Sequence, residues 1–273
     1  MDNAHLELTE DYKKLKLQYE YLKKEFSELY MQKTEMLTYT ESYLNAMYIK
    51  FIGQRQYRKF CMNVELLQIK QRIQLIQGYL NRNEKPDLSA IDREIEKRFE
   101  AYREKLHAES QKILAANAYL KSDFLPDDIV GKIKDVYRLI VKRLHPDLNK
   151  NLTEWGKDLF VKAQAAYDLC DLQTLNEILL SLGTDVSAKI PSEALSLKTC
   201  VEKLEENVGK LKRQIEKLNI QFPFIYAEKL NDTAWVEKEQ KVIDTEIGVL
   251  EKEIEKLSEY MLLLQTWKPE LLN

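Results

Sequence analysis

The sequence predicts an all-α protein in which long coiled-coil helical hairpins flank a shorter antiparallel helix pair. Of the 273 residues only 7 are Gly and 6 are Pro, so few turns can interrupt the helices. Charged residues make up 32% of the chain and hydrophobic residues 44%, a composition typical of helices with a narrow apolar seam. Apolar residues also recur at alternating steps of three and four over much of the chain, which is the spacing of a coiled coil.

The first segment of the N-terminal region, residues 1–122, carries the longest of these seams. Its members are Leu8, Tyr12, Leu15, Tyr19, Leu22, Phe26, Leu29, Lys33 and Met36. Only Lys33 breaks the apolar pattern, and a seam of this kind must face another helix. The tyrosines favour a wide partner surface over the leucine-only seam of a dimeric zipper.

Two further helices are predicted to complete the N-terminal region. Gly53 is expected to mark a bend in the aromatic and basic segment 40–60, after which the apolar seam resumes. The segment 81–89, NRNEKPDLS, clusters the turn-forming residues Asn, Pro and Asp. Ser89 is the expected N-cap of a helix over 88–113. Two apolar helices joined by a short loop predict an antiparallel hairpin.

The C-terminal region, residues 192–273, is predicted to form a second antiparallel coiled-coil hairpin. The seam of its first arm is Leu197, Val201, Leu204, Val208, Leu211, Ile215, Leu218 and Phe222. The seam of its second arm is Val236, Ile243, Ile247, Leu250, Ile254, Leu257, Met261 and Leu264. Pro223 and the cluster Asn231, Asp232 and Thr233 suit a turn and a helix N-cap between the arms. The segment 184–191 is the expected linker before this hairpin.

The middle region, residues 123–183, does not follow the heptad spacing. A helix over 129–144 is expected, with one apolar face formed by Ile133, Val136, Tyr137, Ile140 and Leu144. Lys134, Arg138 and Lys142 are four residues apart and form a positive stripe on another face, with Arg143 beside it. Such a stripe by itself is more often a solvated face. A second helix follows, with small alanines on its inner face, so the two predict an antiparallel pair joined by a loop of roughly eight residues.

The loop between these two helices holds His145, Pro146 and Asp147. Pro146 cannot continue the first helix and disfavours helical backbone at His145, so the helix is expected to end near Leu144. A metal site is not supported, because the other two histidines, His5 and His107, lie in distant segments. Neither a nucleophile nor a cleft is evident for a general base. Two interpretations remain: a histidine that stabilises its own turn, or a tip that binds another protein.

The residues around this loop resemble a known family. The segment 137–149, YRLIVKRLHPDLN, is similar to the second helix and loop of a J domain, the hallmark of DnaJ-family co-chaperones. The matching positions are Tyr137, Arg138, Arg143, His145, Pro146, Asp147 and Asn149. The segment 160–171, FVKAQAAYDLCD, resembles the third helix of that domain. It is in step with that helix at Phe160, Ala163, Ala166, Tyr167 and Asp171.

The resemblance covers about 50 of the 273 residues and departs from the family pattern in several places. Leu139 stands where the family commonly has lysine, and Leu144 where it commonly has an aromatic residue. The usual text of a first helix is absent before residue 129, and the long helix that precedes this point could supply the missing packing. The fourth helix of the family is replaced by LQTLNEILLSL. The chain therefore resembles a divergent J domain.

The resemblance implies a function that is not enzymatic and needs no cofactor or metal. J domains bind DnaK-type chaperones of the heat-shock protein 70 family and stimulate their ATP hydrolysis. By the resemblance, the His-Pro-Asp triplet is the trigger, and basic residues of the second helix meet an acidic groove. The expected chaperone-binding residues are His145, Pro146, Asp147, Arg138, Arg143 and Asn149 by match, with Lys134 and Lys142 added by helical spacing. The coiled coils could bind a client, dimerise, or brace the divergent domain.

Two rival hypotheses belong to other classes of function. In the first, the chain is a coiled-coil scaffold whose J-like helix pair is a structural relic. In the second, weaker hypothesis, a basic and aromatic cluster binds nucleic acid. That cluster consists of Lys50, Arg55, Arg58 and Lys59 with Tyr48 and Tyr57. A formal net charge of −3 argues against nucleic acid as the main partner.

The remaining composition predicts a protein of the reducing cytoplasm. The three cysteines, Cys61, Cys170 and Cys200, are far apart and form no CxxC pair, so neither a zinc site nor a disulfide framework is expected. The N-terminus has no basic stretch followed by an apolar run, so no signal peptide is expected. No stretch approaches the roughly 18 apolar residues of a membrane span, so no membrane association is expected.

Overall fold

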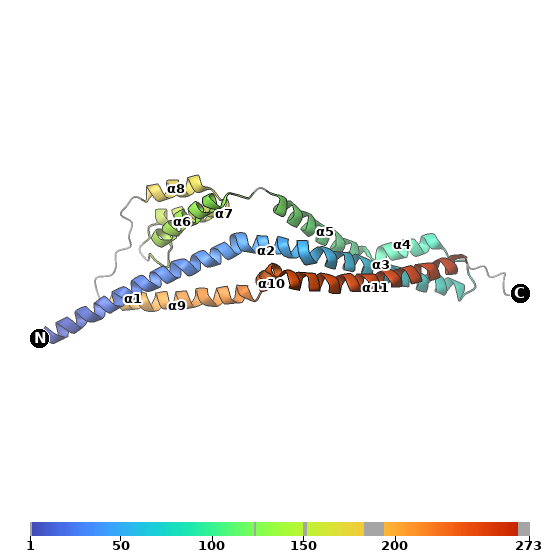
Figure 1. Cartoon of the computed structure of the whole chain (residues 1–273), viewed down its shortest axis with the longest axis horizontal. Coiled ribbons are helices and arrows are strands. Elements are labelled where there is room, and N and C mark those ends of the chain that lie inside the picture. The colour runs from blue at the N-terminus through green and yellow to red at the C-terminus, as the bar shows by residue number, and fades with distance from the viewer. Residues whose placement is uncertain (1, 123, 150–151, 183–193, 267–273) are drawn as a thin grey trace. The chain divides into compact units, whose positions relative to one another are not determined.

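The computed structural model describes residues 2–122, 124–149, 152–182 and 194–266, with the backbone alone for residues 2–9 and 194. Every regular element within these ranges is a helix, which confirms the predicted all-α class (Figure 1). The chain folds into two compact units, one from residues 1–42 and 123–224 and the other from residues 43–122 and 225–273. The predicted linker at 184–191 lies outside the described residues.

The first unit pairs the long N-terminal helix with a helix that begins at residue 194. Its elements are α1 (Asp2–Glu35), η1 (Met36–Thr40), α6 (Asp127–Leu144), α7 (Glu154–Asp168), α8 (Leu172–Ser181) and α9 (Ala194–Asn219). Helices α1 and α9 lie side by side (Figure 1). Their shared apolar cluster includes Tyr19, Leu22 and Phe26 of α1 and Leu197, Val201, Leu204, Val208 and Leu211 of α9. Most residues of both predicted seams are therefore buried against each other, whereas Phe222 at the end of the second seam is exposed.

Polar side chains at the edge of this seam also join α1 to α9. The amine of Lys212 lies 2.6 Å from a carboxylate oxygen of Glu25. Lys33, which breaks the apolar pattern of the α1 seam, donates from its amine to the side-chain oxygen of Gln214 at 2.9 Å. The long stem of a lysine can lie along an apolar seam while its amine reaches a polar partner, which explains how this position is tolerated.

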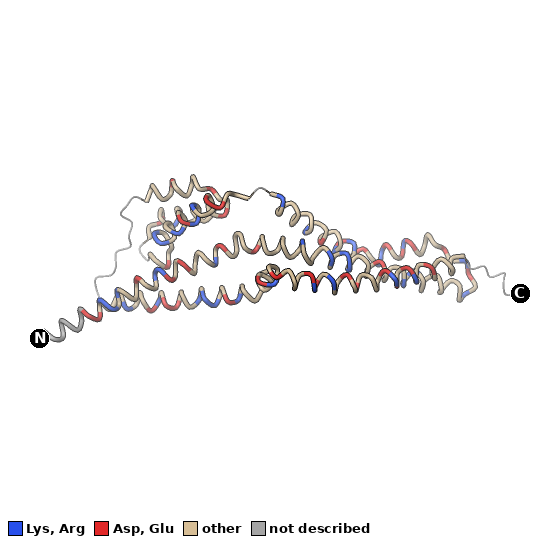
Figure 2. The backbone as a smooth tube through the Cα atoms, viewed as in Figure 1, with Lys and Arg blue, Asp and Glu red and all other residues tan. Residues whose placement is uncertain are grey.

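The second unit is built in the same way. Its elements are η2 (Ile49–Gly53), α3 (Gln54–Leu80), α4 (Leu88–Arg98), α5 (Glu100–Lys121), α10 (Ala227–Asn231) and α11 (Thr233–Thr266). Two short elements cross the boundary between the units, α2 (Glu41–Tyr48) and η3 (Phe224–Tyr226). Helices α3 and α11 lie side by side; the charged residues of α3 are mostly basic, and α11 carries both acidic and basic residues (Figure 2). Four ion pairs join these helices, Arg55–Asp244, Arg58–Glu251, Lys59–Glu246 and Lys70–Glu253.

The predicted C-terminal hairpin of residues 192–273 is wrong in its pairing. Its first arm, α9, packs on α1 in one unit, and its second arm, α11, packs on α3 in the other. The predicted N-terminal region of residues 1–122 is likewise divided between the units. The physical reason is that an apolar seam requires a partner seam but does not select one, because the residues facing each other are of one chemical kind.

Three local predictions also need correction. The N-cap of α4 is Asp87, whose carboxylate accepts from the backbone N–H of Ala90 at 3.0 Å, and not Ser89. The predicted helix over 88–113 is divided at the buried residue Phe99, whose φ of −101° and ψ of 10° interrupt it without a Gly or Pro. Gly53 has helical angles, φ −59° and ψ −36°, and closes the π-helical stretch η2 where a bend was expected.

Zero-length cross-linking with a carbodiimide distinguishes the observed pairing from a C-terminal hairpin. This reagent joins a lysine amine to a carboxylate only when the two are in contact. We expect links between Lys212 and Glu25, which lie 2.6 Å apart, and between Lys59 and Glu246, also 2.6 Å apart. Mass spectrometry of the digested monomer identifies the linked peptides. Prevalent links between lysines of α9 and carboxylates of α11 would contradict the pairing described above.

Candidate partner-binding site

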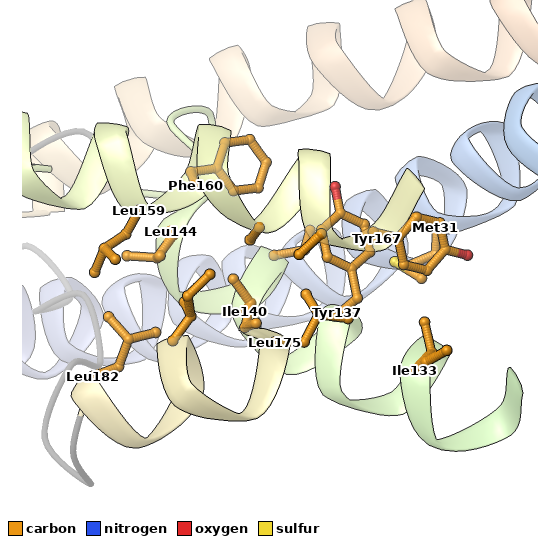
Figure 3. Packing of buried hydrophobic residues seen from close by; sticks show 14 residues of the cluster. Met31, Ile133, Tyr137, Ile140, Leu144, Leu159, Phe160, Tyr167, Leu175 and Leu182 are labelled. Atoms are coloured by element: carbon orange, nitrogen blue, oxygen red, sulfur yellow. The ribbon is translucent and has the colours of Figure 1, made fainter. Parts of the chain in front are cut away.

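The region that holds the His-Pro-Asp loop is a small helical module with its own core. Helices α6, α7 and α8 pack against one another, and their apolar faces meet in one cluster (Figure 3). Its buried members are Ile133, Tyr137, Ile140, Val141, Leu144, Leu159, Phe160, Ala163, Ala166, Tyr167, Leu175, Ile178 and Leu182, together with Met31 of α1. The core residues that the sequence predicts for α6 and α7 are therefore brought together, and α8 and α1 complete their burial.

The ends of these helices follow from local sequence chemistry. Helix α6 ends at Leu144, and His145 has the extended angles, φ −66° and ψ 127°, that a following proline favours. Thr153 caps α7, because its hydroxyl accepts from the backbone N–H of Gly156 at 3.2 Å. Beyond α7, Cys170 adopts a left-handed φ of 56°, and the N–H of Asp171 bonds to the carbonyl of Ala166 at 2.8 Å. This is the hydrogen-bond pattern of a Schellman helix end.

Two tyrosines at the centre of the core stack on each other. The rings of Tyr137 and Tyr167 lie 4.3 Å apart at an interplanar angle of 22°. Burial raises the pKa of both phenols, and the neighbouring Tyr30 of α1 raises the pKa of Tyr137 further. Tyr39, just after α1, donates from its hydroxyl to the backbone carbonyl of Tyr167 at 2.9 Å. Residues remote in sequence are thus part of the core that presents the loop.

The imidazole of His145 is buried and lies among aromatic rings. Its exposed fraction is 8%, whereas Pro146 and Asp147 are exposed. The ring centroid lies 4.8 Å from that of Phe26, 4.4 Å from that of Tyr30 and 5.2 Å from that of Phe160. The Nδ1 atom accepts the backbone N–H of Asp147 at 3.1 Å. The histidine therefore stabilises its own turn, which is one of the two interpretations that the sequence left open.

This environment shifts the protonation of His145. Burial lowers the pKa of the imidazole from 6.5 to about 4, and the nearby Asp147 carboxylate raises it in part. Desolvation disfavours the charged form of a base, so the neutral ring is the stable form in the folded chain. A neutral imidazole with Nδ1 as acceptor carries its proton on Nε2, which is the tautomer consistent with the Asp147 contact.

Asn149 also lies inside the loop. Its exposed fraction is 6%, and its amide donates to the backbone carbonyls of Lys142 and His145, each at 3.3 Å. The Lys142 carbonyl lies in the last turn of α6, where Pro146 cannot donate to it, and the His145 carbonyl also accepts from the backbone N–H groups of Leu148 and Asn149 at 3.0 Å. Asn149, which the sequence assigned to chaperone binding, therefore holds the loop to the helix end and presents little surface to a partner.

The predicted basic residues lie along α6, but one of them is engaged by α1. Arg138 is exposed and donates to the carboxylate of Asp135, one turn earlier, at 3.1 Å. Lys142 and Arg143 are half-buried at the end of the helix. Lys134 is half-buried and forms an ion pair with Glu35 of α1. The basic stripe is present on α6 as the spacing predicts. Its first residue, Lys134, is paired with the carboxylate of Glu35 from a helix remote in sequence.

Helix α1, and not the helix before residue 129 that the sequence suggested, packs against the module of α6, α7 and α8. Met31 belongs to the module's core, and Tyr30 and Tyr39 pack against it, whereas α5 belongs to the other unit. The sequence contained a signal for this arrangement. Tyr30 and Met31 fall beside the α1 seam and widen its apolar face, whereas the seam tyrosines Tyr12 and Tyr19, from which a wide partner surface was expected, pack in the cluster with α9.

Comparison with known proteins adds no relative to this description. Protein-family models, curated proteins and solved structures were searched, and none matches the chain significantly. The resemblance to a J domain therefore rests on the residues quoted above and stays a prediction. Within the part of the chain that the structure describes, no group of three His, Cys, Asp or Glu side chains is arranged to hold a metal ion. None of the described helices is long and apolar enough to cross a membrane.

The depressed pKa of His145 predicts a pH-dependent stability. In the unfolded chain the imidazole takes up a proton below pH 6.5, whereas in the folded chain it does so only below about pH 4. Stability from the neutral ring is thus complete above pH 6.5 and is lost as pH falls toward 4. We expect the wild type to lose about 3 kcal/mol more unfolding free energy than His145→Gln over this interval.

Denaturant unfolding at a series of pH values measures this difference. Carboxylate titration affects both proteins equally and cancels in the comparison. The matched control is His107→Gln, because His107 is exposed on α5 and its replacement should leave the pH profile unchanged. Parallel profiles for the wild type and His145→Gln would mean that water reaches the imidazole.

The role of Asn149 predicts a loss of stability on truncation. Asn149→Ala removes both side-chain hydrogen bonds to the end of α6 and takes its donor from the Lys142 carbonyl, to which Pro146 cannot donate, which should cost about 1–3 kcal/mol of unfolding free energy. Asn176→Ala, at an exposed position on α8, is the matched control and should cost less than about 0.5 kcal/mol. Equal costs in chemical denaturation would show that the Asn149 amide does not hold the loop.

Proposed function

We propose that this chain is a J-domain co-chaperone that binds a DnaK-type chaperone through its His-Pro-Asp loop and stimulates ATP hydrolysis by that chaperone. One observation carries the proposal. His145, Pro146 and Asp147 join two packed helices whose matched core residues are all buried, as the presentation of such a loop requires. A chain of this kind acts on another enzyme and performs no chemistry of its own. The cytoplasm, where DnaK-type chaperones work, is the compartment that fits this role.

The exposed chemistry of the module supports binding to an acidic partner. Pro146 and Asp147 are accessible at the tip, and Pro146 restricts the loop, so less conformational entropy is lost on docking. Arg138 is exposed on α6, and Lys142 and Arg143 continue the positive charge toward the loop. Clustered positive charge attracts an acidic surface and speeds encounter. Leu139, which is 45% exposed between these basic residues, offers a small apolar contact.

The burial of His145 favours a second candidate function. A histidine whose ring packs among Phe26, Tyr30 and Phe160 and whose Nδ1 atom accepts from Asp147 has a structural role that needs no partner. In that case the chain is a helical scaffold, and the triplet persists because it ends α6 and shapes the loop. The exposed Asp147 side chain has no such structural role, and it separates the two functions.

Nucleic-acid binding by the basic cluster of the second unit is not proposed. Three of its basic side chains, Arg55, Arg58 and Lys59, form ion pairs with Asp244, Glu251 and Glu246 of α11. These positions serve the pairing of α3 with α11. The long helix pairs of both units are instead the surfaces that we assign to client binding or self-association.

Steady-state ATP hydrolysis by the host's DnaK-type chaperones tests the proposal. We expect the wild-type chain to stimulate hydrolysis and Asp147→Asn to lose most of that stimulation, because the variant removes an exposed charge and leaves the buried contacts of the loop intact. Asp158→Asn, at an exposed position on α7, is the matched control and should retain it. Equal rates with and without the wild-type protein, for every DnaK-type chaperone of the host, would favour the scaffold.

A further inference from the structure

We propose that the segment of α1 from Phe26 to Glu35 is a built-in cover that regulates the His-Pro-Asp loop, so that His145 becomes accessible only when α1 separates from α6 and α7. This inference rests on the proposed co-chaperone function and names its regulation. The loop and its cover belong to the same unit of the structure. They are nevertheless more than a hundred residues apart in sequence, so separation of α1 breaks no local structure of the loop.

The aromatic contacts show that α1 covers the imidazole of His145. Two of the three rings that enclose His145 come from α1, namely Phe26 and Tyr30, and only Phe160 comes from the module itself. Leu148, the residue after Asp147, is buried in the cluster that α1 forms with α9. Withdrawal of α1 would therefore expose the imidazole and Leu148 together, next to Pro146 and Asp147, which are already exposed.

Glu35 of α1 places a negative charge on the basic stripe of α6, as an acidic partner would. It forms an ion pair with Lys134, the first member of the basic stripe. An acidic surface that docks on this stripe must compete with Glu35 for the same amine, which couples docking to the release of α1. Helix α1 and η1 also contact the module through Met31, Tyr30 and Tyr39, which pack on its core, and through polar bonds to α7. Gln164 donates to the hydroxyl of Tyr30 at 3.0 Å, and Thr38 donates to Asp168 at 3.3 Å.

The covered face of α1 also contains an unfavourable group. Ser27 has an exposed fraction of 0%, and its hydroxyl oxygen has no hydrogen-bond partner among the described residues. It lies one helical turn before Tyr30 and Met31, on the face that contacts the module. A buried hydroxyl without a partner destabilises the covered state relative to a state in which water reaches it. Replacement by alanine should therefore strengthen the cover.

Chemical modification of histidine tests the cover without any chaperone. Diethylpyrocarbonate acylates accessible imidazoles, and His107, exposed on α5, is an internal reference in the same chain. We expect His145 to react roughly tenfold more slowly than His107 in the wild type, because only the open population reacts. Glu35→Lys should raise the rate at His145 roughly three- to tenfold, since a like-charge contact replaces an ion pair. Ser27→Ala should lower it.

The matched control is Glu28→Lys, which makes the same charge change on the same helix. Glu28 is exposed and pairs with Lys24 of α1 itself, at 3.9 Å, and not with α6. This variant should leave the rate at His145 unchanged. Circular dichroism of each variant verifies that helix content is retained, so that faster labelling reports opening and not unfolding.

The outcomes test the covering of His145 by α1 separately from the proposed co-chaperone function. Faster labelling of His145 in Glu35→Lys, together with greater stimulation of ATP hydrolysis, supports the cover as a regulator. Faster labelling without stimulation by any variant retains the cover and overturns the co-chaperone function. Equal reactivity of His145 and His107 in the wild type overturns the cover, even if the chain stimulates hydrolysis. Unchanged labelling in Glu35→Lys and Ser27→Ala also overturns it.

Discussion

The packing of α1 on two neighbours at once is the constraint on which the first unit depends. One side of this helix buries a seam against α9, and the adjacent side contributes Tyr30 and Met31 to the module of α6, α7 and α8. Phe26 lies where the two sides meet and contacts the ring of His145. A helix with a single narrow seam could not hold both partners, so the additional aromatic residues of this segment determine where the loop lies.

The environment of His145 reconciles two interpretations that look opposed. Its acceptor contact with Asp147 and its enclosure by rings give it a structural role, and the same enclosure makes it unavailable to a partner. The desolvation that lowers the pKa of this imidazole depends on α1, because the rings of Phe26 and Tyr30 complete the apolar pocket. Under the proposed regulation by α1, the structural and triggering roles belong to two states of one unit.

The two units use different physical means to specify the pairing of similar seams. In the second unit, four ion pairs along α3 and α11 place basic residues opposite acidic ones. Each exposed pair contributes little stability, but wrong registers bring like charges together. In the first unit, side-chain size and shape contribute more, since the seam of α1 packs the rings of Tyr19 and Phe26 against the aliphatic residues of α9. Basic clusters that look like binding surfaces in sequence can therefore be the charged edge of a helix pair.

The sequence by itself determined what local physics controls. It predicted the all-α class, the end of α6 before Pro146, and the apolar faces of α6 and α7. It could not choose between equivalent seams, so the pairing of α9 with α1 and of α11 with α3 required the tertiary structure. Nor could it show that Phe26 and Tyr30 enclose His145, or that Glu35 pairs with Lys134 of α6. Contacts between residues so far apart in sequence depend on which helices pack together, and no local pattern encodes that choice.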